Sequence, residues 1–333
     1  MSIQLSRRAR ILWLAVPSLL VLLCLVAMFF LNHEPPPFNP ISRATVHAQD
    51  HGHQVVTGYA TTATLIETVD ALLNKRGGYM SNDILPPWVF LDNLPNWEFG
   101  VLVQVRDLAR AMRNDFSRSQ TQSTEDPDLA EADPLFHYDS ARWIPPDTEG
   151  RYRKGAEALE RYLTRLSSSS EPDAQFYARA DNLTEWLSIV EKRLGSLSQR
   201  LSASVGQVRL NTDLSGDTQA RQSTESPQIL VVKTPWTQVD DVFYEARGTA
   251  WALVHFLHAM EVDFDDVLRK KNALVSFRQI IRELESTLEP LHSPMVLNGS
   301  QFGLFANHSL IMANYIARAN AAIIDLGKLL QEG

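Results

Sequence analysis

The residues best suited to chemistry are two carboxylates beside a tryptophan. Asp92 and Glu98 flank Trp97 in the stretch SNDILPPWVFLDNLPNWEFG, which begins at Ser81. Glycoside cleavage uses two carboxyl groups, one with an environment-shifted pKa, and tryptophan can stack on the sugar. The pair therefore suggests a hydrolase of cell-wall glycan. The simpler interpretation is that Glu98 lies in the first turn of a helix, where negative charge is favoured.

Histidines form two groups with the residue types of a metal site. His255, His258 and Glu261 are spaced by three along a predicted helix. Positions i and i+3 share a face, but i+6 is turned by about 120°, so Glu261 would join the imidazoles poorly. The group suggests either a metal-dependent hydrolase or histidines packed at a helix interface. The second group comprises His47, Asp50, His51 and His53. We expect it to be a solvated connection, because a metal site needs a fixed geometry.

Other sequence signals of catalysis are missing. The chain has no glycine-rich phosphate loop, no GxSxG motif and no CxxC pair. We therefore expect no cofactor, and the sequence leans against an enzyme without deciding the question.

The region from Ser81 to Asn96 also offers a surface for a partner. Its apolar residues are too crowded, and too interrupted by proline, to lie on one helical stripe. Burying a large apolar side chain is worth about 1.5–3 kcal/mol, so we expect a non-helical plug with Trp88 mainly buried. Only its rim, around Asp92 and Asn93, would remain for a partner.

Three arginines form a basic stripe on the following predicted helix. Arg106, Arg110 and Arg113 have helical spacing, which places them on one face. They could meet anionic headgroups or the nearby acidic segment TEDPDLAEAD, and the plainest alternative is a solvated helix face.

An uncharged run from Ile11 to Leu31 predicts a membrane anchor. At about 1.5 Å per residue it can cross a hydrocarbon core of about 30 Å. Three arginines lie in residues 1–10 and the next lysine or arginine is Arg43, so the positive-inside rule predicts a cytoplasmic tail at 1–10. The run is longer than the apolar region of a signal peptide and lacks a small-x-small cleavage site. We therefore expect residues 11–31 to stay in the lipid bilayer.

Charge and cysteine content restrict the part beyond the anchor. The only cysteine, Cys24, lies within the apolar run, so the rest can form no disulfide, as suits a bacterial periplasm. Beyond Leu31 there are 28 basic and 39 acidic residues, a formal charge of −11. Such a surface argues against nucleic acid as a partner.

Periodicity predicts a mainly α fold with little or no β structure. The transmembrane helix is followed by a proline- and histidine-containing spacer at 32–56. A helical-bundle domain with long loops then occupies residues 57–333. A subdivision near 207–234 is possible, where QILVVKT could be one short strand or a packed loop. We expect Ser117 to Asp147 to be mostly loop. The predicted helices begin near residues 61, 96, 152, 173, 236, 267 and 308.

The strongest periodic signal is an apolar seam from Phe176 to Leu201, with alternating spacings of four and three. This is the pattern of a coiled coil in a helix running from about Asp173 to Val205. We favour packing of the seam against another helix of the same chain, with a homodimer through 176–201 as the alternative.

Several segments carry a family resemblance that covers nearly the whole chain. They are NHEPPPF, VTGYATTATLIETVDALLNKRGGYMSND, LPNWEFGVLVQVRDL and SLSQRLSASVGQV. Together they resemble an uncharacterised family of single-span proteobacterial inner-membrane proteins, the domain of unknown function 2333 family. The resemblance implies a bacterial inner-membrane location and brings no activity. We expect an N-in, single-pass protein that acts as a non-enzymatic envelope scaffold with a protein partner. The alternative is a periplasmic hydrolase.

Overall fold

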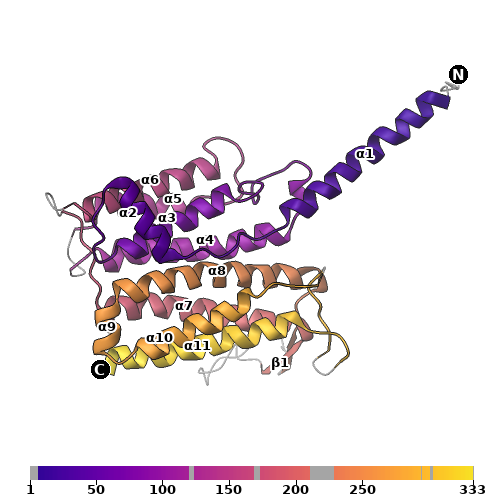
Figure 1. The fold of residues 1–333 in the computed structure, drawn as a ribbon. Coiled ribbons are helices and arrows are strands. Elements are labelled where there is room, and N and C mark those ends of the chain that lie inside the picture. Colours follow the sequence, from indigo (N-terminus) through magenta and orange to yellow (C-terminus); the bar gives the residue numbers. More distant parts are fainter. Residues whose placement is uncertain are drawn as a thin grey trace, which may run out of the picture.

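A computed structural model describes residues 7–119, 124–168, 173–210, 229–293, 295–300 and 303–332. It is 71% helix and 2% strand, which confirms the predicted mainly α class. Helix α1 (Arg7–Leu31) projects away from the other helices, which are stacked in two halves (Figure 1). The first half contains α2 (Pro40–His51), α3 (Tyr59–Asn74), α4 (Asn93–Ala111), α5 (Pro127–Phe136) and α6 (Thr148–Leu166). The second contains α7 (Ala180–Ser202), α8 (Val239–Asp263), α9 (Asp265–Lys270), α10 (Leu274–Glu285) and α11 (His308–Glu332).

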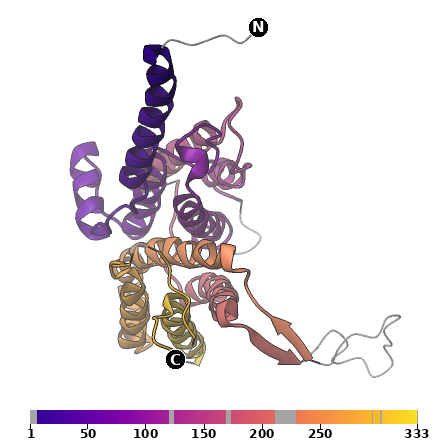
Figure 2. The same cartoon turned by 90° about the vertical axis from the view of Figure 1, so that its right-hand side faces the viewer.

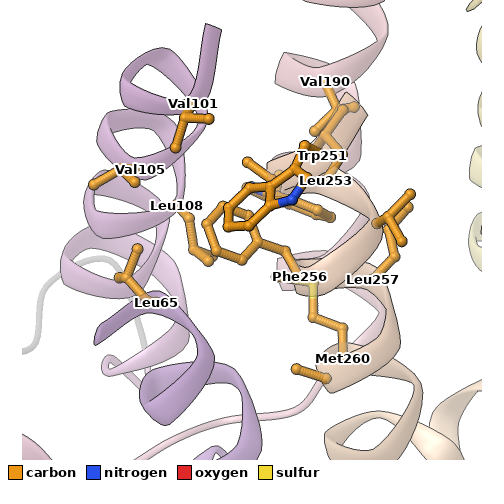
Figure 3. Close-up of a cluster of buried hydrophobic side chains, with 14 of the residues drawn as sticks. Leu65, Val101, Val105, Leu108, Val190, Trp251, Leu253, Phe256, Leu257 and Met260 are labelled. Atoms are coloured by element: carbon orange, nitrogen blue, oxygen red, sulfur yellow. The ribbon is translucent and has the colours of Figure 1, made fainter. Parts of the chain in front are cut away.

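Helix α8 joins the two halves because it is apolar on nearly every side. Its buried side chains meet α3, α4 and α7 in one core, whose centre is shown in Figure 3. Two glycines bring α4 and α8 unusually close. A Cβ on Gly100 would lie 2.1 Å from the Glu245 carbonyl oxygen, and a Cβ on Gly248 would lie 2.0 Å from that of Trp97. No larger residue fits at either position without moving a helix.

The apolar seam lies on α7 and is buried within the chain. Leu183, Leu187, Val190 and Leu194 are each at most 1% exposed, and α7 packs mainly on α11. The helix begins at Ala180, about two turns later than predicted, and residues 173–179 are not helical. A homodimer through 176–201 remains a prediction. It would require α7 to separate from α11.

Two helices occur where the sequence predicts other structure. Helix α5 lies within the segment expected to be mostly loop, and α2 lies within the expected spacer. Both begin in the same way, with an Asx N-cap followed by proline. Asn39 caps the helix that starts at Pro40, and the Asp126 carboxylate accepts hydrogen bonds from the backbone of Asp128 and Leu129. Proline at the first helical position lacks only an N–H group that would have no partner there anyway.

The segment between α1 and α2 lies against α8, which also departs from the expected spacer. The carboxylate of Glu34 forms a two-pronged ion pair with Arg247, with its shortest contacts at 2.7 Å. The backbone N–H of Phe38 donates to Nε2 of His255, and the two rings stack with centroids 4.0 Å apart. These contacts attach the chain to the domain directly after α1.

Two strands account for the expected β structure. β1 (Gln207–Leu210) pairs antiparallel with β2 (Ile229–Val232), and Gln207 lies opposite Val232. The apolar run QILVVKT therefore contains a strand, one of the two predicted alternatives. The remainder of the proposed subdivision, residues 211–228, lies outside the described part of the chain.

Candidate functional site

Glu98 serves as a structural partner in the interior. Its side chain is fully buried and its Oε1 is paired with the Nζ of Lys75, which is buried as well. The backbone N–H groups of Met80 and Ser81 donate to its two oxygens at 2.8 Å, and the Ser81 hydroxyl also donates. Burial lowers the pKa of Lys75, and the Glu98 carboxylate opposes that shift. Both carboxylate oxygens are thus used to hold the start of the α3–α4 loop on α4.

Asp92 does not share a site with Glu98. It is exposed and caps α4, accepting from the backbone N–H of Asn93 at 2.9 Å. The helix begins at Asn93, about one turn before the start predicted near residue 96. Because one carboxylate faces solvent and the other is enclosed, the pair lacks the common substrate-facing arrangement that glycoside cleavage requires.

Arg106 and Arg110 of α4, and Arg113 of the π-helical turn Met112–Phe116 that follows it, contact α5 and its flanking residues. Arg106 donates to the carbonyl oxygens of Phe136 and Tyr138, and Arg110 contacts the His137 ring at 2.8 Å. Arg113 bonds Glu125 at 2.7 Å and Asp133 at 3.1 Å. The predicted contact with the acidic segment is therefore present for Arg113, whereas Arg106 and Arg110 contact residues that follow this segment. The other acids of that segment pair with Arg161 and Arg165 of α6.

The three residues of the first histidine group, His255, His258 and Glu261, each contact a different partner. His255 is fully buried between Phe38 and the Trp251 carbonyl oxygen, and burial lowers its pKa to about 4. His258 contacts Glu285 at 3.1 Å, and Glu261 pairs with Arg278. In the part of the chain that the structure describes, no three His, Cys, Asp or Glu side chains are arranged to hold a metal ion.

The second histidine group is ordered on α2 and its C-terminal end, where a solvated connection was predicted. His47 contacts the hydroxyl of Tyr59 at 2.9 Å and Glu160 at 3.0 Å, which raises the pKa of this imidazole mainly through the Glu160 hydrogen bond. His51 stacks on His47, and His53 reaches the same Tyr59 hydroxyl at 3.1 Å. Asp50 is exposed. The cluster joins α2 to α3 and α6.

The predicted plug is largely wrong. Leu91 and Leu94 are buried, and Trp88 is partly buried in a short turn, Trp88–Phe90. However, four of the apolar side chains before Leu91 are at least half exposed: Ile84, Leu85, Val89 and Phe90. Asn93 is only partly exposed, so the expected rim reduces mainly to Asp92.

The structure adds a groove that no motif indicates. Between α4, α7 and α8 lies a cavity of about 440 Å³, within the range of small-molecule sites. Its lining includes Phe99 and Gln104 of α4, Lys192 and Arg193 of α7, and Glu245 of α8. A neighbouring hollow of about 340 Å³ shares Ser196 and Arg200 with it. We refer to the two together as the α4–α7–α8 groove.

Polar groups inside the groove are available for binding. The Gln104 side chain is buried, and neither of its amide atoms has a hydrogen-bond partner among the described residues. Such an amide calls for a water or a ligand group, since a buried polar atom without a partner is costly. Arg193 is bound to Asp107 at 2.8 Å and Arg200 to Glu245, so the basic rim is held in place.

One comparison identifies the family. A family model described as "Uncharacterized protein conserved in bacteria (DUF2333)" matches residues 6–333. The chain belongs to the DUF2333 family. No curated protein and no solved structure matches it. The match confirms the resemblance seen in the sequence, and the family description names no activity to assign to the groove.

The groove residues of this DUF2333 protein escape sequence reasoning for a physical reason. Those of the 440 Å³ cavity come from three helices between residues 99 and 249, and each follows the ordinary pattern of its own helix. Only their assembly makes a cavity. The one local signal is Gln104, a polar residue among the apolar positions of α4.

Proposed function

We propose that this DUF2333 protein is a membrane-anchored component of the bacterial envelope, whose helical domain is a non-enzymatic scaffold or interaction module on the periplasmic side. The observation that carries the proposal is α1. Its segment Leu14–Leu31 has a mean hydropathy of 2.8 and none of its residues is fully buried, unlike the core helix of a soluble protein. A bilayer is the environment in which such a helix is stable.

Contacts at the end of α1 support a retained anchor over a cleaved signal sequence. Met28 and Leu31 pack against the core, and the next residues are tied to α8 through Glu34 and Phe38. Cleavage after the apolar run would separate the domain from side chains that belong to its packing. The arginines of the N-terminal segment support an N-in orientation.

The non-enzymatic role is supported by how the catalytic candidates are used. Glu98, His255, His258 and Glu261 each hold parts of the fold together. The α4–α7–α8 groove, with its fixed basic rim and unpartnered amide, is the surface suited to a polypeptide partner of the envelope.

Fusions to the C-terminus test the topology. Alkaline phosphatase, which works only after export, should be active there, and a green fluorescent protein that folds only in the cytoplasm should be dark. The reverse pattern at equal expression would reject the proposal.

Photo-crosslinking in intact cells tests the partner surface. A photoreactive residue at Phe99 or Ile189, both in the groove, should give a discrete adduct with another envelope protein. The matched control is Ile324, an exposed apolar residue of α11 outside the groove. Equal adducts at all three positions would contradict the groove as the interaction site.

A further inference from the structure

Two loops expose large apolar side chains at the same end of the molecule. The α3–α4 loop exposes Ile84, Leu85, Val89 and Phe90, and the α5–α6 loop exposes Trp143 and Ile144, each by 50–66%. We call these six residues the apolar loop patch. The loops are joined by two hydrogen bonds, from the Tyr79 hydroxyl to the Ser140 carbonyl oxygen at 3.0 Å and from Asn82 Nδ2 to that of Arg142 at 3.2 Å.

The patch lies where α1 leaves the domain. A Cβ on Gly77 would lie 2.8 Å from Leu31 Cδ2 and 3.4 Å from Trp88 Nε1, so the last residue of α1 and the α3–α4 loop are neighbours. Both loops lie at the end of the molecule from which α1 extends (Figure 1). Seen from that end, the α5–α6 loop extends in the same direction as α1 (Figure 2).

The position of Leu31 decides what covers the patch. The apolar segment of α1 ends at this residue, so a bilayer that holds α1 has its surface close to Leu31 and Trp88. The bilayer therefore reaches the loops without any further association step. Transfer of each large apolar side chain out of water is worth about 1.5–3 kcal/mol, so water is the less stable environment for the patch.

The residues around the patch also suit a membrane interface. Trp88 and Trp143 have the amphipathic rings that are enriched at the headgroup level. Asp83 and Asp92 lie on either side of the apolar run in the α3–α4 loop and are exposed, so they limit how deeply it can enter. Arg142, next to Trp143 and also exposed, is placed to reach a lipid phosphate.

We propose that the apolar loop patch inserts into the interface of the bilayer that α1 crosses, giving the domain a second, monotopic contact with lipid. This inference rests on the proposed function for α1 as the anchor. Side chains at this level would enter about 5–10 Å into the headgroup and acyl boundary. The loops and α1 together would then hold the domain at a defined angle to the membrane.

Nitroxide labels on the full chain can test the insertion. With Cys24, the only cysteine, replaced by serine, single cysteines are placed at Leu85, Phe90 and Ile144. Val208 and Val275 serve as matched controls, because they are exposed apolar residues outside these loops, and Val21 reports on α1. The protein is reconstituted in vesicles of phosphatidylethanolamine and phosphatidylglycerol. Collision rates with oxygen, which enters the bilayer, and with a nickel chelate, which stays in water, are then measured.

The expected result is an oxygen-to-nickel collision ratio several-fold higher at the three loop positions than at Val208 and Val275, with Val21 higher still. If Val21 is in lipid while the loop labels match the controls, the inference is overturned and the anchor stands. Loop labels shielded from both reagents would show protein covering the patch and would also overturn it. A water-exposed Val21 would reject the proposed anchor and the inference with it.

Discussion

Glu98 has the sequence neighbours of a catalytic carboxylate, with Trp97 beside it and Asp92 nearby, yet in the structure both its oxygens hold the fold together. The sequence predicts Glu98 in the first turn of a helix, but α4 begins at Asn93, which places Glu98 in the second turn. The sequence does not show that Lys75, at the C-terminal end of α3, is buried together with Glu98. Long-range pairing of this kind depends on the complete packing and leaves no local pattern.

Replacement of Glu98 should therefore act on stability. We expect Glu98→Gln to lower the free energy of unfolding by about 3–5 kcal/mol, because it leaves the Lys75 ammonium buried without a counter-ion. In the double variant Lys75→Met/Glu98→Gln, much of that loss should be recovered. Urea denaturation monitors both, and Asp92→Asn, at an exposed cap, is the control. An unchanged unfolding midpoint for Glu98→Gln would contradict the structural role.

At the scale of elements, the helices with strong periodicity were predicted and those with capping signals were missed. Helices α3, α4, α6, α7, α8 and α11 follow apolar stripes in the sequence. Helices α2 and α5 begin with Asn39-Pro40 and Asp126-Pro127, where we interpreted proline as a break. Proline after an Asx residue is as much a signal that a helix starts as that one ends.

The contact between α4 and α8 yields a second prediction. Gly100→Ala should destabilise the protein by at least about 2 kcal/mol, since the new methyl group would collide with the backbone of α8 at Glu245. Gly327→Ala in α11 is the matched control. Nothing lies within 4 Å of its new Cβ, so it should stabilise by about 0.5–1 kcal/mol. Thermal unfolding followed by circular dichroism measures both, and equal shifts would refute the close approach.

At the scale of the whole molecule, the error over the α3–α4 loop is instructive. The sequence predicts a plug because apolar side chains avoid water, and burial in the protein is the usual way to achieve this. Trp88 packs on the core, but its neighbours remain exposed beside α1. For a chain with an apolar helix, lipid is a second place for such side chains, and the sequence of a loop does not distinguish the two.

The connection between α1 and the domain should respond to acid. The folded pKa of His255 is about 4, below the ordinary 6.5, so the unfolded chain binds this proton more readily. Stability from this group is complete above about pH 6.5 and is lost as the pH falls towards 4, by about 2 kcal/mol between pH 7 and pH 5. His255→Gln should flatten this dependence in urea titrations. An unchanged slope in His255→Gln would contradict this origin of the acid sensitivity.

The ion pair of Glu34 with Arg247 and the seating of Phe38 on His255 begin only three residues after α1 ends. A connection this short restricts rotation of the domain relative to α1. With α1 in a bilayer, the α4–α7–α8 groove would therefore lie at a fixed distance from the lipid surface and in a fixed orientation. Its occupant would have to arrive at that same height, which favours other proteins anchored in the same membrane over those that diffuse freely.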